Sequence, residues 1–391
     1  MKKTLLTSIF CILVFLSYTQ EYLKLHHKAI LVDTHNDILE QCLNKGYSFD
    51  NDLRGKTHSD LQRFKQGGVD VQMFSVWCDG QQKNPFAYAN RMMDTVYAVA
   101  QRHPDYLKIV YNSKQMFRAV HHHQLAAMFG VEGGHMMEDD VKNLDSFYNR
   151  GVRYMTLTWN NSTSWATSAT DEASGKPLPN KGLSDFGKQV VKRMNELGIM
   201  VDVSHVGEQT FWDVINTTTK PVIASHSSVY NICPVPRNLK DDQIKAIAKN
   251  GGVIQVNFFS GFLDSNYNRK KLAFEQSHQK EIDSLLKINP ERYFAEDYLF
   301  AKYPGEVQSL RAPFDLVIQH IDYIVKLVGV DYAGIGSDFD GIESSPQKLD
   351  DVTTYPLITK ALLEKGYSKK NIRKILGGNF IRVLRANEKN K

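Results

Sequence analysis

Eight short apolar runs, rich in β-branched residues, recur along the chain and alternate with longer amphipathic segments. Uninterrupted apolar runs of this length are typical of strands buried on both faces, as in a parallel sheet. Eight such strands alternating with helices predict an α/β fold, a (β/α)8 TIM-like barrel. The chain has 391 residues, 42% of them hydrophobic, so it can bury such a core without cross-links. The runs lie at 29–35, 69–77, 125–133, 152–159, 198–206, 221–228, 251–259 and 332–341.

The segments between the runs carry helix signals. A helix is predicted at 183–198, where Ser184 caps the first turn and Gly198 follows the last. The connection between the seventh and eighth runs is too long for a single helix of the barrel. We therefore expect a helical insertion before the last strand, at about 260–312, followed by a helix at 314–329 that leads into this strand.

Residues 1–19 have the layout of a secretory signal peptide. Two basic residues, Lys2 and Lys3, precede an apolar run from Leu5 to Leu16 that is too short to span a bilayer comfortably. We expect an exported protein, periplasmic or secreted, with a single domain over 20–391 and no transmembrane segment after signal removal. An uncleaved N-terminal anchor is the alternative.

Charge and cysteine usage narrow the function classes. The net charge of +5 is spread along the chain rather than clustered, which argues against a nucleic-acid-binding protein. Cys42, Cys78 and Cys233 are the cysteines outside the predicted signal peptide, and their wide spacing fits neither a disulfide framework nor a zinc finger. We expect no disulfide.

Six acidic and histidine residues fall at the carboxyl ends of predicted strands, where barrel enzymes build their active sites. Carboxylates and imidazoles are costly to bury unless they are paired or bind a metal. Their oxygen and nitrogen atoms are ligands that catalytic zinc accepts, and a bridging carboxylate could hold two ions about 3.5–4 Å apart. We therefore expect a site for two divalent ions. The six residues are His35, Asp37, Glu132, His205, His226 and Asp338.

Each of the six residues alone would be weak evidence for a metal site, because a single His-x-Asp or Ser-His is common in loops. The remaining histidines have simpler interpretations. The tract 121–123 precedes its strand, so we expect it to be exposed at the opposite end of the barrel. His320 lies on an amphipathic helix and is expected to pack against its neighbours. His135, three residues after Glu132, could orient a metal ligand or support the core.

Six motifs occur in a fixed order: LVDTHND, GVEGGH, VDVSH, VIASHSS, PRN and GSDFDG. In order and spacing they resemble the membrane (renal-type) dipeptidase family, peptidase family M19, of the amidohydrolase superfamily. The resemblance extends from Leu31 to the C-terminal GGNFIRVL. It implies a (β/α)8 barrel with two Zn²⁺ ions per subunit, and it suggests a homodimer.

The resemblance also implies how the metal ligands divide between the two ions. His35 and Asp37 would bind the first zinc ion, and His205 and His226 would bind the second. Glu132 would bridge both ions.

Further roles, and two departures from the family pattern, follow from the same comparison. Asp338 would lie close to the first ion and transfer protons, and Arg237 would bind the free carboxylate of the substrate through its planar guanidinium. Trp159 stands where the animal enzymes carry a histidine thought to polarise the substrate carbonyl, and we expect it to line the substrate pocket. Cys78 and Cys233 fall near disulfide positions of the animal enzymes, but their partners are missing.

These features predict a zinc dipeptidase in which a hydroxide bridging the two ions attacks the peptide carbonyl, with Asp338 and Glu132 as catalytic residues. Tolerance of D-residues at the C-terminal position is implied by the resemblance. One alternative is another binuclear-zinc amidohydrolase, such as a lactonase or a β-lactam or amide hydrolase, which would not depend on Arg237. The other alternative is a non-catalytic exported binding protein.

Overall fold

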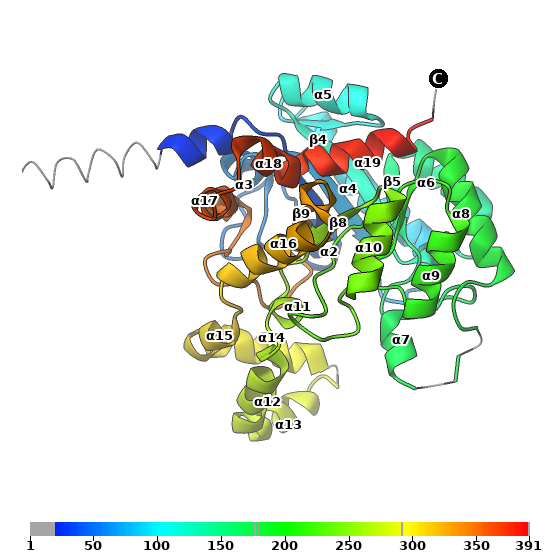
Figure 1. Ribbon diagram of the computed structural model, residues 1–391. Coiled ribbons are helices and arrows are strands. Elements are labelled where there is room, and N and C mark those ends of the chain that lie inside the picture. Colours follow the sequence, from blue (N-terminus) through cyan, green and yellow to red (C-terminus); the bar gives the residue numbers. More distant parts are fainter. Residues whose placement is uncertain (1–19, 176, 179, 291, 390–391) are drawn as a thin grey trace, which may run out of the picture.

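Eight parallel strands form a nearly closed barrel in this computed structural model, which describes residues 20–175, 177–178, 180–290 and 292–389 (Figure 1). The fold class predicted from the eight apolar runs is confirmed. The predicted signal peptide at 1–19 lies outside the described residues. In barrel order the strands are β1 (Leu31–Asn36), β2 (Val69–Trp77), β4 (Leu125–Glu132), β5 (Val152–Thr156), β6 (Met200–Asp202), β7 (Ile223–Ala224), β8 (Val253–Val256) and β9 (Ala333–Ile335).

The seam of the barrel lies between the ends of β1 and β9. The backbone N–H of Asp338 donates to the carbonyl of His35 at 3.0 Å, and the N–H of Asp37 donates to the carbonyl of Phe339 at 2.9 Å. These bonds join the two segments that carry His35, Asp37 and Asp338. A short strand that the sequence did not predict, β3 (Leu107–Ile109), pairs with β4 outside the barrel order.

The interior of the barrel is filled by side chains from alternate positions of its strands, and it is closed at one end by α19 (Asn379–Asn387). Apolar residues of this helix join the interior cluster, so the amino ends of the strands are covered and the carboxyl ends remain for a site. The cluster includes Val71, Met128, Met200, Ile223, Val253, Phe380, Val383 and Leu384.

Helices surround the barrel (Figure 1). The predicted capping signals act as expected in α8, because the Ser184 side chain accepts the backbone N–H of Gly187 and Gly198 takes a left-handed φ of 87°. The helices are α2 (Ile38–Lys45), α3 (Leu61–Gln66), α4 (Pro85–Arg102), α5 (Ser113–His121), α6 (Val141–Asn149), α7 (Ala169–Ala173), α8 (Asp185–Leu197), α9 (Glu208–Thr217), α10 (Asp241–Asn250), α16 (Asp315–Val328), α17 (Pro356–Glu364) and α18 (Lys369–Arg373).

A helical insertion precedes the last strand, as the fold prediction stated. Figure 1 shows it as an arm on the side of the molecule opposite α19. The arm has a small apolar cluster of its own, which includes Phe274, Ile282 and Leu299, so its helices pack against one another. They are α11 (Ser260–Leu263), α12 (Tyr267–Ser277), α13 (Gln279–Leu286), α14 (Arg292–Lys302) and α15 (Pro304–Leu310).

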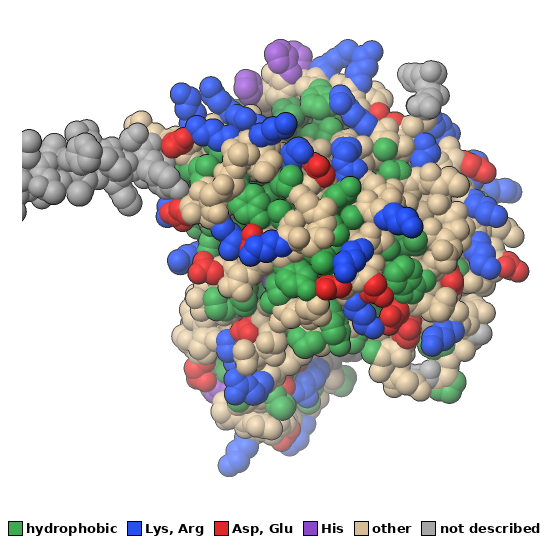
Figure 2. Space-filling view, in the orientation of Figure 1, with side chains coloured by type: hydrophobic (Ala, Val, Ile, Leu, Met, Phe, Trp, Pro, Cys, Tyr) green, Lys and Arg blue, Asp and Glu red, His purple; other side chains and the backbone are tan. Residues whose placement is uncertain are grey.

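The surface carries charges of both signs (Figure 2), and the described cysteines lie inside the protein. Basic and acidic side chains are interspersed over the face drawn in Figure 2. Cys42, Cys78 and Cys233 are buried and are not in disulfides. Among the described helices, none combines the length and the apolar character needed to cross a membrane.

Candidate metal centre

The carboxyl ends of the strands bring the six predicted residues together. His35 is the fifth residue of β1, Asp37 directly follows this strand, and Glu132 is the last residue of β4. His205 and His226 follow β6 and β7, and Asp338 follows β9. Five of the six residues are buried, and Asp338, whose side chain is 14% exposed, lies with them at the mouth of the barrel.

Glu132 lies at the centre of the cluster. Its Oε2 atom is 3.2 Å from Nε2 of His35, and its Oε1 atom is 2.9 Å from Nε2 of His205 and 3.5 Å from Nε2 of His226. Nε2 of His35 is also 3.5 Å from Oδ2 of Asp37 and 4.0 Å from Oδ1 of Asp338. Donor atoms therefore lie on both sides of one carboxylate, an arrangement that a bridging ligand requires.

Two overlapping sets of three residues have donor atoms within 4.8 Å of one another. One set is His35, Glu132 and His226, and the other is His35, Asp37 and Asp338. Imidazole nitrogen and carboxylate oxygen are the ligands of catalytic zinc sites, so the chemistry of both sets suits this ion.

Each of the three imidazoles is held through Nδ1, which leaves Nε2 directed at the centre. Nδ1 of His35 lies 2.8 Å from the Tyr154 hydroxyl, which itself donates to the Thr34 carbonyl at 2.9 Å and so accepts the imidazole N–H. Metal-binding histidines are commonly fixed in this way, because a hydrogen bond at one ring nitrogen sets the tautomer and aims the other.

His226 and His205 are fixed by the same principle. Nδ1 of His226 lies 2.7 Å from the Ser225 hydroxyl, which donates to Asp202 at 2.6 Å and therefore accepts the N–H. Nδ1 of His205 lies 3.2 Å from Oδ1 of Asn160.

Two of the six residues have left-handed backbone conformations. φ is 62° at His205 and 64° at Asp338, values that residues other than glycine seldom adopt. Such conformations cost free energy and persist where the surrounding structure imposes them, most often at functional sites. Here they turn two side chains toward Glu132 beyond the ends of short strands.

Burial and neighbouring charges shift the pKa values of the clustered carboxyl and imidazole groups. Burial favours neutral forms, and it raises the pKa of Asp37 and of Asp338 above the ordinary carboxyl value. Burial opposes protonation of His35, but Asp37 and Glu132 outweigh it and raise the pKa of this imidazole to about 10. The carboxylates thus favour a positive charge at Nε2 of His35, where a bound cation would replace the proton.

The other two imidazoles favour their neutral, metal-binding form. Burial, together with the nearby charge of Arg237, lowers the pKa of His205 to about 4. Burial also lowers the pKa of His226 well below its ordinary value. For Glu132, burial acts against ionisation, but the neighbouring imidazoles outweigh it and hold its pKa well below the ordinary value.

Two further observations fit a bound cation. Oδ2 of Asp37 is buried and has no hydrogen-bond partner in the described part of the chain. Nε2 of His205 and Nε2 of His226 lie 2.9 Å apart, so two nitrogen lone pairs face each other unless a proton or a cation is shared between them. The residues present therefore fit a zinc centre.

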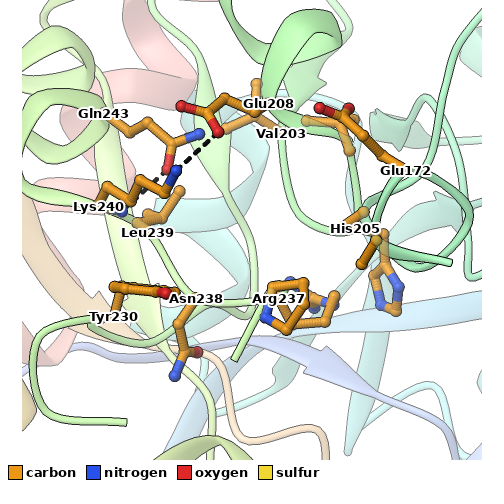
Figure 3. Close-up of a pocket in the computed structure, with 14 residues that line it drawn as sticks. Glu172, Val203, His205, Glu208, Tyr230, Arg237, Asn238, Leu239, Lys240 and Gln243 are labelled. Atoms are coloured by element: carbon orange, nitrogen blue, oxygen red, sulfur yellow. Dashed lines mark hydrogen bonds and ion pairs between the residues drawn. The ribbon is translucent and has the colours of Figure 1, made fainter. Parts of the chain in front are cut away.

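Arg237 lies beside the cluster on the wall of a cavity of about 290 Å³, which His205 and Tyr230 also line (Figure 3). Its guanidinium donates to Ser227 Oγ at 3.2 Å and to the His226 carbonyl at 3.1 Å, while its Nε has no partner within the described residues. Burial lowers the pKa of Arg237 to about 10, so the group remains charged at neutral pH. A buried guanidinium with a free donor suits an anionic ligand group.

The other residues singled out in the sequence lie outside the cluster. Trp159 packs edge to face on Trp77, with ring centroids 4.9 Å apart, and it is not among the residues that line the cavity beside Arg237. The tract 121–123 is exposed at the end of α5, and His320 is buried, as expected for both. His135 lies 3.1 Å from the carbonyl of Cys78, so it ties the ends of β2 and β4.

Sequence reasoning missed several residues that hold the cluster in place. Tyr154, Asn160 and Ser225 fix the imidazoles, and Nδ2 of Asn257 donates to Oδ2 of Asp338 at 2.7 Å. Asn257 directly follows β8 but lies two residues before the end of the seventh apolar run, so its only signal was a polar residue within an apolar run. Tyr154 lies within its strand and gave no such signal.

Comparisons with known proteins identify relatives of this chain. The chain is 33% identical over 392 aligned residues to an uncharacterized dipeptidase of Schizosaccharomyces pombe, covering 94% of this chain and 83% of that protein. It resembles the crystal structure of the probable dipeptidase PvdM from Pseudomonas aeruginosa with a TM-score of 0.77 and 25% identity, over 95% of this chain and 98% of that one.

A metallopeptidase from Rhodobacter sphaeroides, solved with a phosphinate mimic of the dipeptide L-Ala-D-Ala, has the same fold. The TM-score is 0.74 at 22% identity, over 92% of this chain and 100% of that one. The sequence model of the membrane dipeptidase family matches residues 19–391. The chain therefore belongs to the membrane dipeptidase family, peptidase family M19, whose members are metal-dependent dipeptide hydrolases.

Proposed function

We propose that this protein is a zinc dipeptidase that holds two zinc ions and hydrolyses dipeptides, including those with a D-residue at the C-terminal position. One observation carries the proposal: three imidazoles with fixed Nδ1 atoms direct Nε2 toward the carboxylate of Glu132, beside a buried guanidinium. His35 and Asp37 are the proposed ligands on one side of Glu132, and His205 and His226 those on the other.

When bound, a zinc pair supplies Lewis acidity, which polarises a substrate carbonyl and makes water a stronger acid. Asp338 would accept the proton from the attacking water and deliver it to the departing amine as the peptide C–N bond breaks. Its carboxylate is oriented for this task, because Asn257 holds Oδ2 while Oδ1 faces the cluster. Burial raises the pKa of Asp338 above the ordinary carboxyl value, which makes its carboxylate a stronger base.

Arg237 would bind the C-terminal carboxylate of the substrate. The guanidinium and His205 line the same cavity, so a carboxylate bound there would lie near a carbonyl at the proposed zinc centre. This placement restricts the substrate to short peptides with a free carboxylate near the scissile bond. The L-Ala-D-Ala mimic bound by the Rhodobacter sphaeroides metallopeptidase supports acceptance of a D-residue here.

The test is a metal-removal experiment. The purified protein is freed of metal by a chelator, and hydrolysis of L-Ala-L-Ala and L-Ala-D-Ala is measured before and after addition of zinc. Activity should be lost on chelation and return at about two zinc ions per chain. Undiminished hydrolysis by the metal-free protein would contradict the proposal.

The competing function is another amide or lactone hydrolysis at the same metal centre. The two functions differ in their dependence on Arg237, because a lactone or a simple amide lacks the free carboxylate that this side chain would bind. Arg237→Ala should raise KM for dipeptides about tenfold to hundredfold, as expected for loss of a charged hydrogen bond. A lactonase or simple amidase would keep its activity in this variant.

A further inference from the structure

The cavity beside Arg237 contains more charge than recognition of a carboxylate requires. It is bounded by loops that follow β5, β6 and β7 and by the ends of α7, α9 and α10. Figure 3 shows Glu172 and Glu208 along one side of it and Arg237 along the opposite side, with His205 at one end.

Two of the charged groups neutralise each other. Nζ of Lys240 lies 2.7 Å from Oε2 of Glu208, so these side chains form an ion pair at the edge of the cavity. Arg237 and Glu172 are left as opposite charges on the cavity wall. Neither is paired with the other: Oε2 of Glu172 is buried and, like Nε of Arg237, lacks a hydrogen-bond partner among the described residues.

The local backbone makes room for the Glu172 carboxylate. Gly207 is the residue before α9, and a Cβ atom at this position would lie 2.1 Å from Oε2 of Glu172. Glycine therefore permits the carboxylate to lie against the amino end of α9. The cavity thus presents a negative group that the surrounding protein accommodates but does not pair.

We propose that Glu172 selects dipeptides whose C-terminal residue has a cationic side chain, as in lysine or arginine. This inference rests on the proposed dipeptidase function. With the α-carboxylate on Arg237 and the scissile carbonyl at the metal centre, the side chain of the C-terminal residue enters the cavity. A residue that carries both a carboxylate and a cation satisfies the two unpaired charges at once, whereas the N-terminal residue lies beyond the scissile bond.

The experiment compares substrates that differ in charge at one position. L-Ala-L-Lys, L-Ala-L-norleucine and L-Ala-L-Glu are assayed with the zinc-loaded wild-type protein, Glu172→Gln, Glu172→Lys and Glu196→Gln. Norleucine has the same side-chain carbons as lysine but lacks the ammonium group. Glu196 pairs with Arg193 on α8 and does not line the cavity, so its variant is the matched control.

The wild type should hydrolyse L-Ala-L-Lys with a kcat/KM at least about tenfold above that for L-Ala-L-norleucine, since a buried charged hydrogen bond is worth that much. Glu172→Gln should remove this preference and leave L-Ala-L-norleucine unchanged. Glu172→Lys should gain activity toward L-Ala-L-Glu, a gain that misfolding cannot produce. Glu196→Gln should match the wild type.

The outcomes separate this inference from the dipeptidase function on which it rests. Hydrolysis of all three dipeptides without a preference for lysine, or a preference that survives in Glu172→Gln, would overturn the role of Glu172 alone. Failure of the zinc-loaded wild type to hydrolyse any of the three, or L-Ala-D-Ala, would overturn both.

Discussion

Removing the Tyr154 hydroxyl tests most directly how the fold orients a proposed metal ligand. This side chain is fully buried, accepts Nδ1–H of His35 at 2.8 Å and donates to the Thr34 carbonyl at 2.9 Å. Tyr154→Phe removes only the hydroxyl and keeps the ring, which packs against Gly130. The variant leaves a buried imidazole N–H without a partner, or lets the proton move to Nε2, the proposed metal-binding atom.

Either response weakens zinc binding on the His35 side of Glu132. An unpaired buried donor costs about 1–3 kcal/mol, and loss of the group that orients a metal-bound histidine commonly lowers affinity about 10–100-fold. We therefore expect the variant to hold about one zinc ion at chelator concentrations where the wild type holds two. The measurement is a competition titration against a chelator of known affinity, with metal content determined per chain.

Tyr355→Phe provides the matched control. Tyr355 is also fully buried, but its hydroxyl donates to Oδ2 of Asp33 at 2.8 Å and not to a proposed ligand. This variant should lose stability while keeping its zinc affinity. Equal affinity in Tyr154→Phe and the wild type, or an equal loss in both variants, would refute the reasoning.

Three further changes have distinct expected results. Asn257→Ala should lower kcat about tenfold to hundredfold without loss of zinc, measured by steady-state kinetics and metal analysis, because Asp338 loses the donor that orients it. Gly130→Ala should lower the free energy of unfolding by about 1–3 kcal/mol in urea titrations, since its Cβ would lie 1.9 Å from the buried Tyr154 ring. His320 accepts the Val229 N–H at Nδ1, and burial lowers its pKa to about 4. The imidazole therefore takes up a proton at a higher pH in the unfolded chain than in the folded protein. The free energy of unfolding falls as the pH drops from about 6.5 to about 4, by at most about 3 kcal/mol. In His320→Asn, the free energy of unfolding measured by urea titration should fall less between pH 7 and pH 4.5 than in the wild type. An equal fall in both proteins would contradict this.

The barrel could be predicted because its strands are buried on both faces and therefore read as apolar runs. The same runs placed the six predicted acidic and histidine residues at one edge, since side chains at the carboxyl ends of parallel strands meet there. The β3 strand could not be predicted, because three residues paired at the outside of a sheet carry no apolar pattern. β6 and β7 are also shorter than the apolar runs that predicted them, because the chain continues in turns that carry His205 and His226.

The orientation of the proposed ligands depends on contacts between distant segments, which a single sequence does not display. His205 and Asp338 point inward because their backbones are left-handed, although neither is a glycine that would have signalled such a turn. The His35–Tyr154 bond joins residues 119 positions apart in the chain. The expectation that Trp159 lines the substrate pocket rests on the family resemblance and stays a prediction, and the structure shows its ring packed on Trp77.

Two buried carboxylates outside the cluster, Asp33 and Asp202, hold together the strand ends that carry the donor atoms. Asp33 accepts the Ser337 N–H at 2.9 Å and its hydroxyl at 2.8 Å, which locks the segment before Asp338 onto β1. Asp202 accepts the Thr156 hydroxyl and the Ser225 hydroxyl, each at 2.6 Å, and so joins the ends of β5, β6 and β7. Buried charges are costly unless such donors surround them, so each carboxylate imposes one arrangement of the strand ends. Hydrogen bonds from distant segments to these two carboxylates therefore position the strand ends that carry the proposed ligands.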